Sequence, residues 1–213
     1  MNPLALHLKQ IRIDLHDEQL IALDAVIEPG EILTVMGPSG SGKSTLLAYL
    51  AGFLAPVFKA SGEIILHERR LDKLPAEQRR IGLLFQDPLL FPHLSVGGNL
   101  RFALPPTVSN RKTVIASGLA TMGLDGYAER DPATLSGGQR ARVALLRLLL
   151  SKPEAVLLDE PFSKLDAHLR KEIRQQVFTS LQQAGLPGVL VTHDAEDAAA
   201  AGGRIITLSS ADD

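Results

Sequence analysis

Several residue types are missing or scarce in this chain, and each absence excludes a class of protein. The 213 residues contain no cysteine and no tryptophan, and aromatic residues make up only 4% of the total. Without cysteine, the chain cannot form disulfide bonds or thiolate metal sites. The net charge is −2, and because nucleic-acid-binding proteins usually carry a basic surplus, we expect no nucleic-acid partner.

Long hydrophobic runs are also missing. No stretch approaches the roughly 20 consecutive apolar residues that cross a bilayer as a helix. The first segment, MNPLALHLKQIRIDL, carries Lys9, Arg12 and Asp14, so we do not expect it to form the apolar core of a signal peptide. If the protein works at a membrane, another protein is therefore expected to hold it there.

The sequence does contain many short apolar segments. Alternating apolar residues over 4–15 and the segment QLIALDAVI predict half-buried strands. Runs typical of short buried strands follow: EILTVM, GEIIL beginning at Gly62, IGLLF, EAVLLD, GVLVTH and RIITL. Apolar residues at helical spacing predict helices near 43–54, 111–122, 166–184 and 195–201.

This order of elements predicts the fold class. Strand and helix alternate before residue 86 and after residue 152, with a mostly helical segment between them, which is typical of an α/β fold. We expect a single domain over 1–213 with a mainly parallel sheet and an N-terminal antiparallel β part. Its α/β core would comprise 1–86 and 152–213, and an inserted α-helical subdomain would comprise 87–151.

A phosphate-binding loop follows the strand EILTVM. The segment GPSGSGKS matches G-x-x-x-x-G-K-[ST], in which glycines let consecutive backbone N–H groups point at phosphate oxygens. The lysine would reach the β- and γ-phosphates, and the next serine hydroxyl would bind Mg²⁺. The alternative is a glycine-rich turn that matches by accident. The predicted nucleotide-binding residues are Gly37, Pro38, Ser39, Gly40, Ser41, Gly42, Lys43, Ser44 and Thr45.

An acidic pair ends another predicted strand, AVLLDE. Asp159 stands at the carboxyl end of the strand, where open α/β sheets bind their ligands, and is expected to orient Mg²⁺. Glu160 is expected to polarise the attacking water as a general base. The alternative is a solvated acidic pair that merely closes the strand.

A second anion site is predicted about ninety residues after the first. The turn Ser136-Gly137-Gly138-Gln139 opens directly into the apolar segment RARVALLRLLL. The first turn of a helix has free N–H groups and a partial positive charge, so it attracts anions. The alternative is an ordinary capped helix, because serine is a good N-cap residue.

Six motifs in order carry a family resemblance: the phosphate loop, LLFQD with Gln86, LSGGQ at 135–139, LLDEP at 157–161, SKLD at 163–166 and VTHD at 191–194. The chain resembles the ATP-binding subunits of ATP-binding cassette (ABC) transporters over essentially its whole length. It is similar in particular to bacterial importer ATPases, close to those that import thiamine. The sequence ends soon after RIITL, so we do not expect the C-terminal regulatory domain that some sugar importers carry.

The resemblance implies a role for each motif. Two copies would pack head to tail, and each ATP would lie between the phosphate loop of one copy and Ser136, Gly137, Gly138 and Gln139 of the other. Lys43 and Glu160 would serve catalysis together with Gln86, which would also sense Mg²⁺, and with His193, which would bridge the γ-phosphate and Glu160. Asp166 would couple the two sites across the dimer, or it could simply cap a helix.

Two positions depart from the family pattern. Members usually stack the adenine on an aromatic residue in the first strands, but IRIDLHDEQL holds no Phe, Tyr or Trp. His16 is the ring that remains, and we name it as the stacking candidate, with an exposed turn residue as the alternative. SVGGNL lacks the glutamate that usually precedes the asparagine.

The resemblance also implies partners and a location. We expect a peripheral ATPase at the cytoplasmic face of the inner membrane, with ATP and Mg²⁺ as cofactors and integral membrane permeases as partners. An external solute-binding protein would be an indirect partner, and DPLLFPHL at 87–94, with Phe91 and Leu94, would contact the permease. The cargo would be a small solute, with a thiamine-like molecule suggested. The alternatives are an ABC ATPase in protein assembly or nucleic-acid repair, and a phosphate-loop kinase or GTPase.

Overall fold

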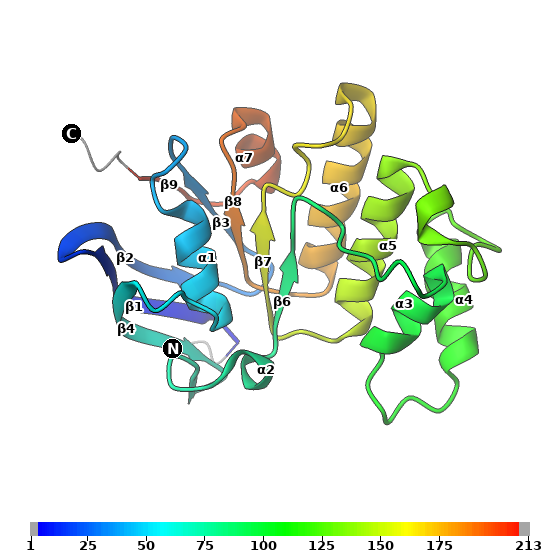
Figure 1. Cartoon of the computed structure of the whole chain (residues 1–213), viewed down its shortest axis with the longest axis horizontal. Helices are drawn as coiled ribbons and strands as arrows, with labels where there is room; N and C mark the ends of the chain where they lie inside the picture. The colour runs from blue at the N-terminus through cyan, green and yellow to red at the C-terminus, as the bar shows by residue number, and fades with distance from the viewer. Residues whose placement is uncertain (1–3, 209–213) are drawn as a thin grey trace. The chain divides into compact units, whose positions relative to one another are not determined.

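The computed structural model of the chain describes residues 4–208, apart from the side chain of His168, and these form two compact units (Figure 1). The first unit comprises the residues up to Leu83, Glu154–Glu160 and the residues from Phe178 onward. The second comprises Leu84–Pro153 and Pro161–Val177. The segment 87–151, which the sequence predicts to be helical, lies in the second unit.

An antiparallel sheet forms the N-terminal part of the first unit. Its strands are β1 (Leu6–Leu15), β2 (Glu18–Ile27), β4 (Phe58–Leu66) and β5 (Arg69–Arg70), in the order β2-β1-β4-β5. Buried and exposed residues alternate along β2, because one face of this sheet meets the core. The antiparallel part expected from the sequence is confirmed.

Strand β4 begins earlier than the sequence predicts. We expected the strand to start at Gly62, but residues 58–61 already pair with β1. Between the pairs Lys9↔Glu63 and Arg12↔Ser61, two β1 residues face the single residue Gly62, which is a β-bulge. A Cβ atom at Gly62 would lie only 2.5 Å from the carbonyl oxygen of Gln10, so glycine marks a close backbone approach here and not a strand end.

A second sheet of the first unit carries the parallel strands. Its members are β3 (Ile32–Met36), β6 (Ile81–Leu84), β7 (Ala155–Asp159), β8 (Gly188–Val191) and β9 (Ile205–Thr207), in the order β6-β7-β8-β3-β9. Strand β3 pairs in parallel with β8 and β9, and β7 pairs in parallel with β8. Strands β3, β7 and β8 are almost wholly buried, as expected for a parallel sheet. The predicted α/β class is therefore confirmed.

Helices α1 (Lys43–Ala51), α2 (Ala76–Arg79) and α7 (Ala195–Ala201) complete the first unit. Leu46, Leu47 and Leu50 of α1 are buried in a core that both sheets share. This burial anchors α1, and the burial of β3 anchors the preceding strand. The loop between them, residues 37–42, is thus held at both ends.

The second unit is helical. It contains α3 (Val96–Ala103), α4 (Arg111–Thr121), the short 3₁₀ helix η1 (Pro132–Thr134), α5 (Gly137–Leu150) and the first part of α6 (Ala167–Gln183). Helices α4 and α5 approach closely at Gly118, where a Cβ atom would lie 2.9 Å from a methyl group of Leu146. The helices predicted near 111–122, 166–184 and 195–201 are therefore present.

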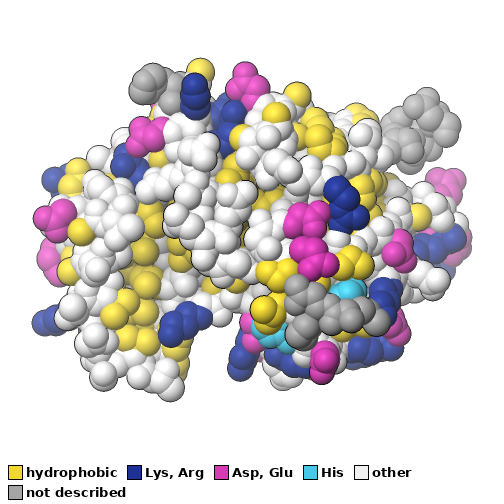
Figure 2. All heavy atoms as spheres, turned by 180° about the vertical axis from the view of Figure 1, so that it is seen from behind, with side chains coloured by type: hydrophobic (Ala, Val, Ile, Leu, Met, Phe, Trp, Pro, Cys, Tyr) yellow, Lys and Arg dark blue, Asp and Glu magenta, His cyan; other side chains and the backbone are white. Residues whose placement is uncertain are grey.

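The surface carries charges of both signs. On the face shown in Figure 2, lysine and arginine side chains are interspersed with aspartate and glutamate, which fits the net charge of −2. None of the helices within residues 4–208 combines the length and the hydrophobicity that a bilayer crossing requires.

Candidate functional site

The candidate site of the first unit lies where three neighbouring parallel strands end. Strand β3 leads to Gly37, β7 ends at Asp159 and is followed by Glu160, and β8 leads through Thr192 to His193. Because these strands are parallel neighbours, their carboxyl ends meet at the same sheet edge, where open α/β sheets bind ligands.

The phosphate loop joins β3 to α1 and depends on its glycines. Gly40 and Gly42 have φ angles of 84° and 85°, in the left-handed region that favours glycine. At Gly42 a Cβ atom would also lie 2.8 Å from Cγ of Leu20. Helix α1 begins at the next residue, so its N-terminal N–H groups face the loop.

Lys43 turns its ammonium group back over the loop. Its Nζ donates hydrogen bonds to the carbonyl oxygens of Gly37 (2.8 Å) and Pro38 (2.7 Å), and only 7% of the residue is exposed. These contacts hold a positive charge inside the loop. A phosphate group that entered the loop would find this charge already in place.

Two side-chain oxygen atoms of the type that binds a metal ion lie near each other, one at the start of α1 and one at the end of β7. Oγ of Ser44 is 3.5 Å from Oδ1 of Asp159. Burial, followed by the nearby Glu160 carboxylate, raises the pKa of Asp159 above its ordinary value, while Ser44 and Lys43 act in the opposite direction. Adjacent ligands of an octahedral Mg²⁺, each at about 2.0–2.1 Å, lie about 2.9 Å apart. The hydroxyl and carboxylate oxygens are the ligand type that Mg²⁺ binds, and a small side-chain movement would bring this pair onto one ion.

Glu160 and His193 form a second pair on the same edge. Nδ1 of His193 lies 3.0 Å from Oε1 of Glu160. The Glu160 N–H donates to the carbonyl of Val191 (2.9 Å), which extends the β7–β8 pairing by one residue. Glu160 has a φ angle of 44°, a conformation that costs a non-glycine residue on the order of 1–3 kcal/mol and is typical of functional sites.

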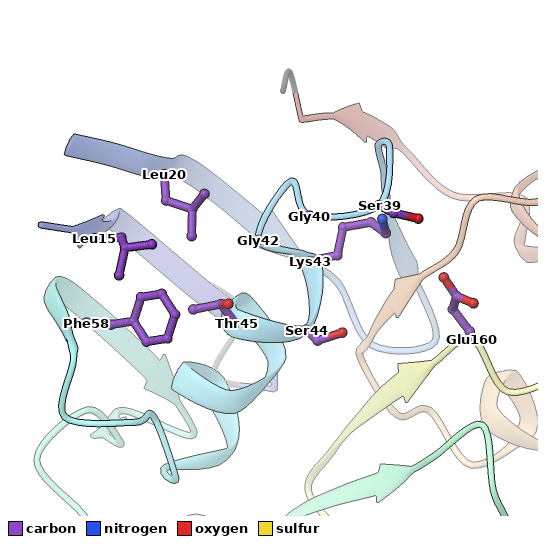
Figure 3. A pocket seen from close by; sticks show the side chains of 10 residues that line it. All are labelled: Leu15, Leu20, Ser39, Gly40, Gly42, Lys43, Ser44, Thr45, Phe58 and Glu160. Carbon is purple, nitrogen blue, oxygen red and sulfur yellow. The ribbon is translucent and has the colours of Figure 1, made fainter. Parts of the chain in front are cut away.

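A cavity of about 390 Å³ lies between the phosphate loop, Glu160 and the antiparallel sheet (Figure 3). Its polar side is formed by the phosphate loop, the start of α1 and Glu160, and its apolar side by Leu15, Leu20 and Phe58. His16 is exposed in the turn between β1 and β2 and is not among the lining residues. Sequence reasoning missed Phe58, which would have required knowledge that β4 starts before Gly62.

The turn before α5 lies in the second unit. Ser136 caps α5: its Oγ accepts from the N–H of Gln139 (3.2 Å), and Oε1 of Gln139 accepts from the N–H of Ser136 (3.0 Å). This is a capping box, so the alternative role of Ser136 as an N-cap is present. Gly137 and Gly138 are the first two residues of the helix, and such N–H groups have no acceptor within a helix.

Two further predicted residues also belong to the second unit. Oδ1 of Asp166 accepts from the N–H of Leu169 (3.0 Å), so Asp166 caps α6. Gln86 is exposed just beyond the end of β6. The roles of both residues in a nucleotide site stay predictions.

Three features meet at one edge of the parallel sheet: a glycine loop with a buried lysine, a serine–aspartate pair and a glutamate. Together they define a phosphate-loop nucleoside triphosphatase. Comparison with known proteins makes this more specific, because the family described as ABC transporter matches residues 20–163. The chain therefore belongs to the ABC transporter family, and it is an ATPase of that family.

Individual proteins that resemble this chain support the same family assignment. The chain is 50% identical over 192 residues to YnjD of Escherichia coli K12, described as an uncharacterized ABC transporter ATP-binding protein, covering 89% of this chain and 88% of YnjD. It is 42% identical to the Fe(3+) ions import ATP-binding protein FbpC 1 of Rhizobium meliloti and 40% identical to the spermidine/putrescine import ATP-binding protein PotA of Oleidesulfovibrio alaskensis. These alignments cover 87% and 88% of this chain, which spans only 53% and 50% of the two import proteins.

Proposed function

We propose that the chain is the ATP-hydrolysing subunit of a membrane importer. The observation that carries this proposal is the arrangement at the edge of the parallel sheet, where Lys43, the Ser44–Asp159 pair and the Glu160–His193 pair follow three neighbouring strands. Relatives named as import ATP-binding proteins support the coupling to import.

In this proposal each group has one task in hydrolysis. The backbone N–H groups of the loop and Lys43 bind the phosphates, and Ser44 and Asp159 hold Mg²⁺, which neutralises charge that develops on the phosphate oxygens. Glu160 accepts a proton from the attacking water. An ionised Glu160 can only accept hydrogen bonds, so Nδ1 of His193 carries the proton in their 3.0 Å contact and keeps the carboxylate oriented.

We further propose that two copies close on ATP, with the Ser136 turn of one copy against the γ-phosphate bound by the other. Gly137 supports this part. A Cβ atom at Gly137 would meet only Leu165, at an ordinary distance of 3.8 Å, so packing within the described chain does not require glycine there. A phosphate approaching the N–H group would require it. Gln86 and Asp166 would relay the state of the site to the partner copy.

We propose the segment 87–94 as the contact for a permease, and two side chains, the half-buried Arg147 and the buried Asn99, fix its backbone. Arg147 donates to the carbonyl oxygens of Pro88 (3.0 Å) and Leu89 (2.9 Å), and burial lowers the pKa of Arg147 from its ordinary value. Asn99 accepts from the N–H of Phe91 (2.8 Å) and donates to the carbonyl of Phe91 (3.1 Å).

The segment 87–94 and the adjoining helix α3 present apolar side chains to solvent. Leu89 is 56% exposed and has a φ angle of 44°, which is unfavourable for a leucine. Phe102 is 70% exposed and packs edge-on against Phe91, with ring centroids 4.9 Å apart. An exposed leucine in a strained backbone supports a contact surface in preference to internal packing.

The cargo of the importer would be a small solute. A thiamine-like molecule stays a prediction, since the relatives named above carry other cargoes in their names. The permease would hold the chain at the cytoplasmic face of the inner membrane, and an external solute-binding protein would deliver the cargo.

Co-purification tests the proposal. The tagged chain, extracted from membranes in detergent with MgATP, is expected to bring down integral membrane permeases and to hydrolyse ATP only with Mg²⁺. Recovery as a complex without membrane proteins would instead favour an ABC ATPase in protein assembly or nucleic-acid repair. Absence of Mg²⁺-dependent hydrolysis would contradict the catalytic assignment.

A further inference from the structure

The apolar end of the cavity in the first unit has no role in phosphate chemistry. Leu15 and Leu20 approach it from β1 and β2, and Phe58 approaches it from β4, while the phosphate loop and Glu160 form the other end (Figure 3). A nucleoside triphosphate has the same division, with charged phosphates at one end and a flat base at the other. The cavity therefore matches the two ends of one ligand.

Phe58 is the aromatic residue among those that line the cavity. Leu15 and Phe58 are direct partners in the antiparallel pairing of β1 with β4, so their side chains project to the same face of the sheet. Phe58 shares this face with Ile64 and Leu66, two positions with the same parity along β4 that are fully buried. The phenyl ring lies at the rim of the core and is only partly buried.

The residue that follows Phe58 has polar neighbours in β1 and in the β1–β2 turn. The next residue of β4, Lys59, forms an ion pair of 2.5 Å with Asp17 in the β1–β2 turn, and Lys59 itself pairs in register with Asp14. Because successive side chains of a strand point to opposite faces, these polar contacts lie on the other face of β4. The strand thus presents Phe58 toward the cavity and Lys59 away from it.

We propose that Phe58 is the residue on which the base of the bound nucleotide stacks, with Leu15 and Leu20 completing the apolar wall. The inference rests on the proposed binding of a nucleoside triphosphate by the phosphate loop. It assigns base recognition to β4, whereas the sequence pointed to His16 in the β1–β2 turn. Stacking on an aromatic ring provides contact area and tolerates different bases.

Binding of MgATP and of Mg²⁺-tripolyphosphate, measured by titration calorimetry, tests the proposal because tripolyphosphate lacks a base. Phe58→Ala is expected to weaken MgATP binding about 10-fold or more and to leave tripolyphosphate binding unchanged. Phe53→Ala is the matched control, because Phe53 is 51% exposed and does not line the cavity. His16→Ala is expected to change neither affinity.

Two further variants keep a large apolar side chain at position 58, so that a change in binding can be distinguished from a loss of folding. Phe58→Leu keeps an apolar side chain but removes the ring, and is expected to lose MgATP affinity selectively. Phe58→Trp introduces a unique fluorophore into a chain that has no tryptophan. Its fluorescence is expected to change with MgATP and not with tripolyphosphate.

The outcomes separate this inference from the proposed function. Lys43→Ala is expected to weaken both ligands, and if the wild-type chain binds neither, the phosphate site itself is refuted. If the wild-type chain binds both, but the ratio of the two affinities is the same with and without the Phe58 ring, the stacking role is overturned. A selective loss of MgATP binding in His16→Ala alone would overturn it as well.

Discussion

Glu160 and His193 meet through a 3.0 Å contact although they follow different strands and lie far apart in the sequence. The contact exists because β7 and β8 are parallel neighbours, and the Glu160 N–H continues their pairing through Val191. Parallel pairing therefore brings a carboxylate and an imidazole from distant parts of the sequence side by side.

Glu160→Gln is expected to bind MgATP normally but to lose turnover by about 100-fold to 10,000-fold, because an amide cannot accept the proton of water as a general base does. The ATP-bound form is then expected to accumulate as a dimer. Steady-state phosphate release and light scattering with MgATP measure the two effects. Glu172→Gln, at an exposed glutamate of α6, is the control, and wild-type turnover in Glu160→Gln would contradict the assignment.

Asp159→Asn is expected to stabilise the nucleotide-free protein while abolishing Mg²⁺-dependent hydrolysis. The pKa of Asp159 is raised above its ordinary value of 3.8, mainly by burial. The folded state then holds this proton more tightly than the unfolded chain, so stability falls as the pH rises from 3.8 through the raised pKa.

Thermal unfolding across a pH series measures this effect. The melting temperature of Asp159→Asn should exceed that of the wild type at pH 7, and the difference should shrink as the pH is lowered. Asp125→Asn, at an exposed aspartate, should show no such trend. A variant less stable than the wild type at pH 7 would show that the ionised carboxylate stabilises the fold.

Gly137 and Gly138 are expected to respond differently to alanine. At Gly138 a Cβ atom would lie 2.4 Å from a methyl group of Leu169, so Gly138→Ala should cost about 1–3 kcal/mol in the free energy of unfolding. Gly137→Ala meets no such contact and should change stability by less than about 0.5 kcal/mol. Urea denaturation measures both values.

The rate of ATP hydrolysis is the second measurement for Gly137→Ala. Gly137→Ala should lower turnover and ATP-dependent dimerisation even though it folds normally, because the new methyl group stands where the phosphate would approach. Full activity in Gly137→Ala would indicate that the turn serves only as a helix cap.

Leu89→Asp and Phe102→Asp are expected to abolish association with a permease while the ATPase rate of the isolated chain stays within about twofold of the wild type. Each change places a charge in the exposed apolar surface of the second unit without touching the phosphate loop. Detergent co-purification and steady-state hydrolysis give the two readouts. Phe53→Asp, at an equally apolar exposed position of the first unit, should keep the permease bound.

Contiguous features of the site could be predicted from the sequence. The phosphate loop is one uninterrupted motif, and the buried runs before Asp159 and His193 are short and apolar, which is typical of strands in a covered parallel sheet. Once these strands were assigned, parallel topology placed their ends together. The α/β class and the N-terminal antiparallel part followed from the same patterns.

Features that depend on pairing between distant segments could not be predicted. Gly62 suggested the start of a strand, since glycine commonly marks a turn, but its role became clear only with the bulge of β1 opposite it. The residues before Gly62 were therefore not recognised as part of β4. That omission left His16 as the apparent residue for stacking the base. Phe58, however, is the partner of Leu15 in the antiparallel pairing of β4 with β1.

The bulge opposite Gly62 has a consequence for how the length of β1 could change in this chain. Gln10 and Ile11 both face Gly62 there, between the regular pairs Lys9↔Glu63 and Arg12↔Ser61. Removing Gln10 alone would leave one β1 residue opposite Gly62, so the ladder would become regular and Leu15 would still face Phe58. Evolution could therefore shorten this strand by one residue without altering the wall of the nucleotide cavity.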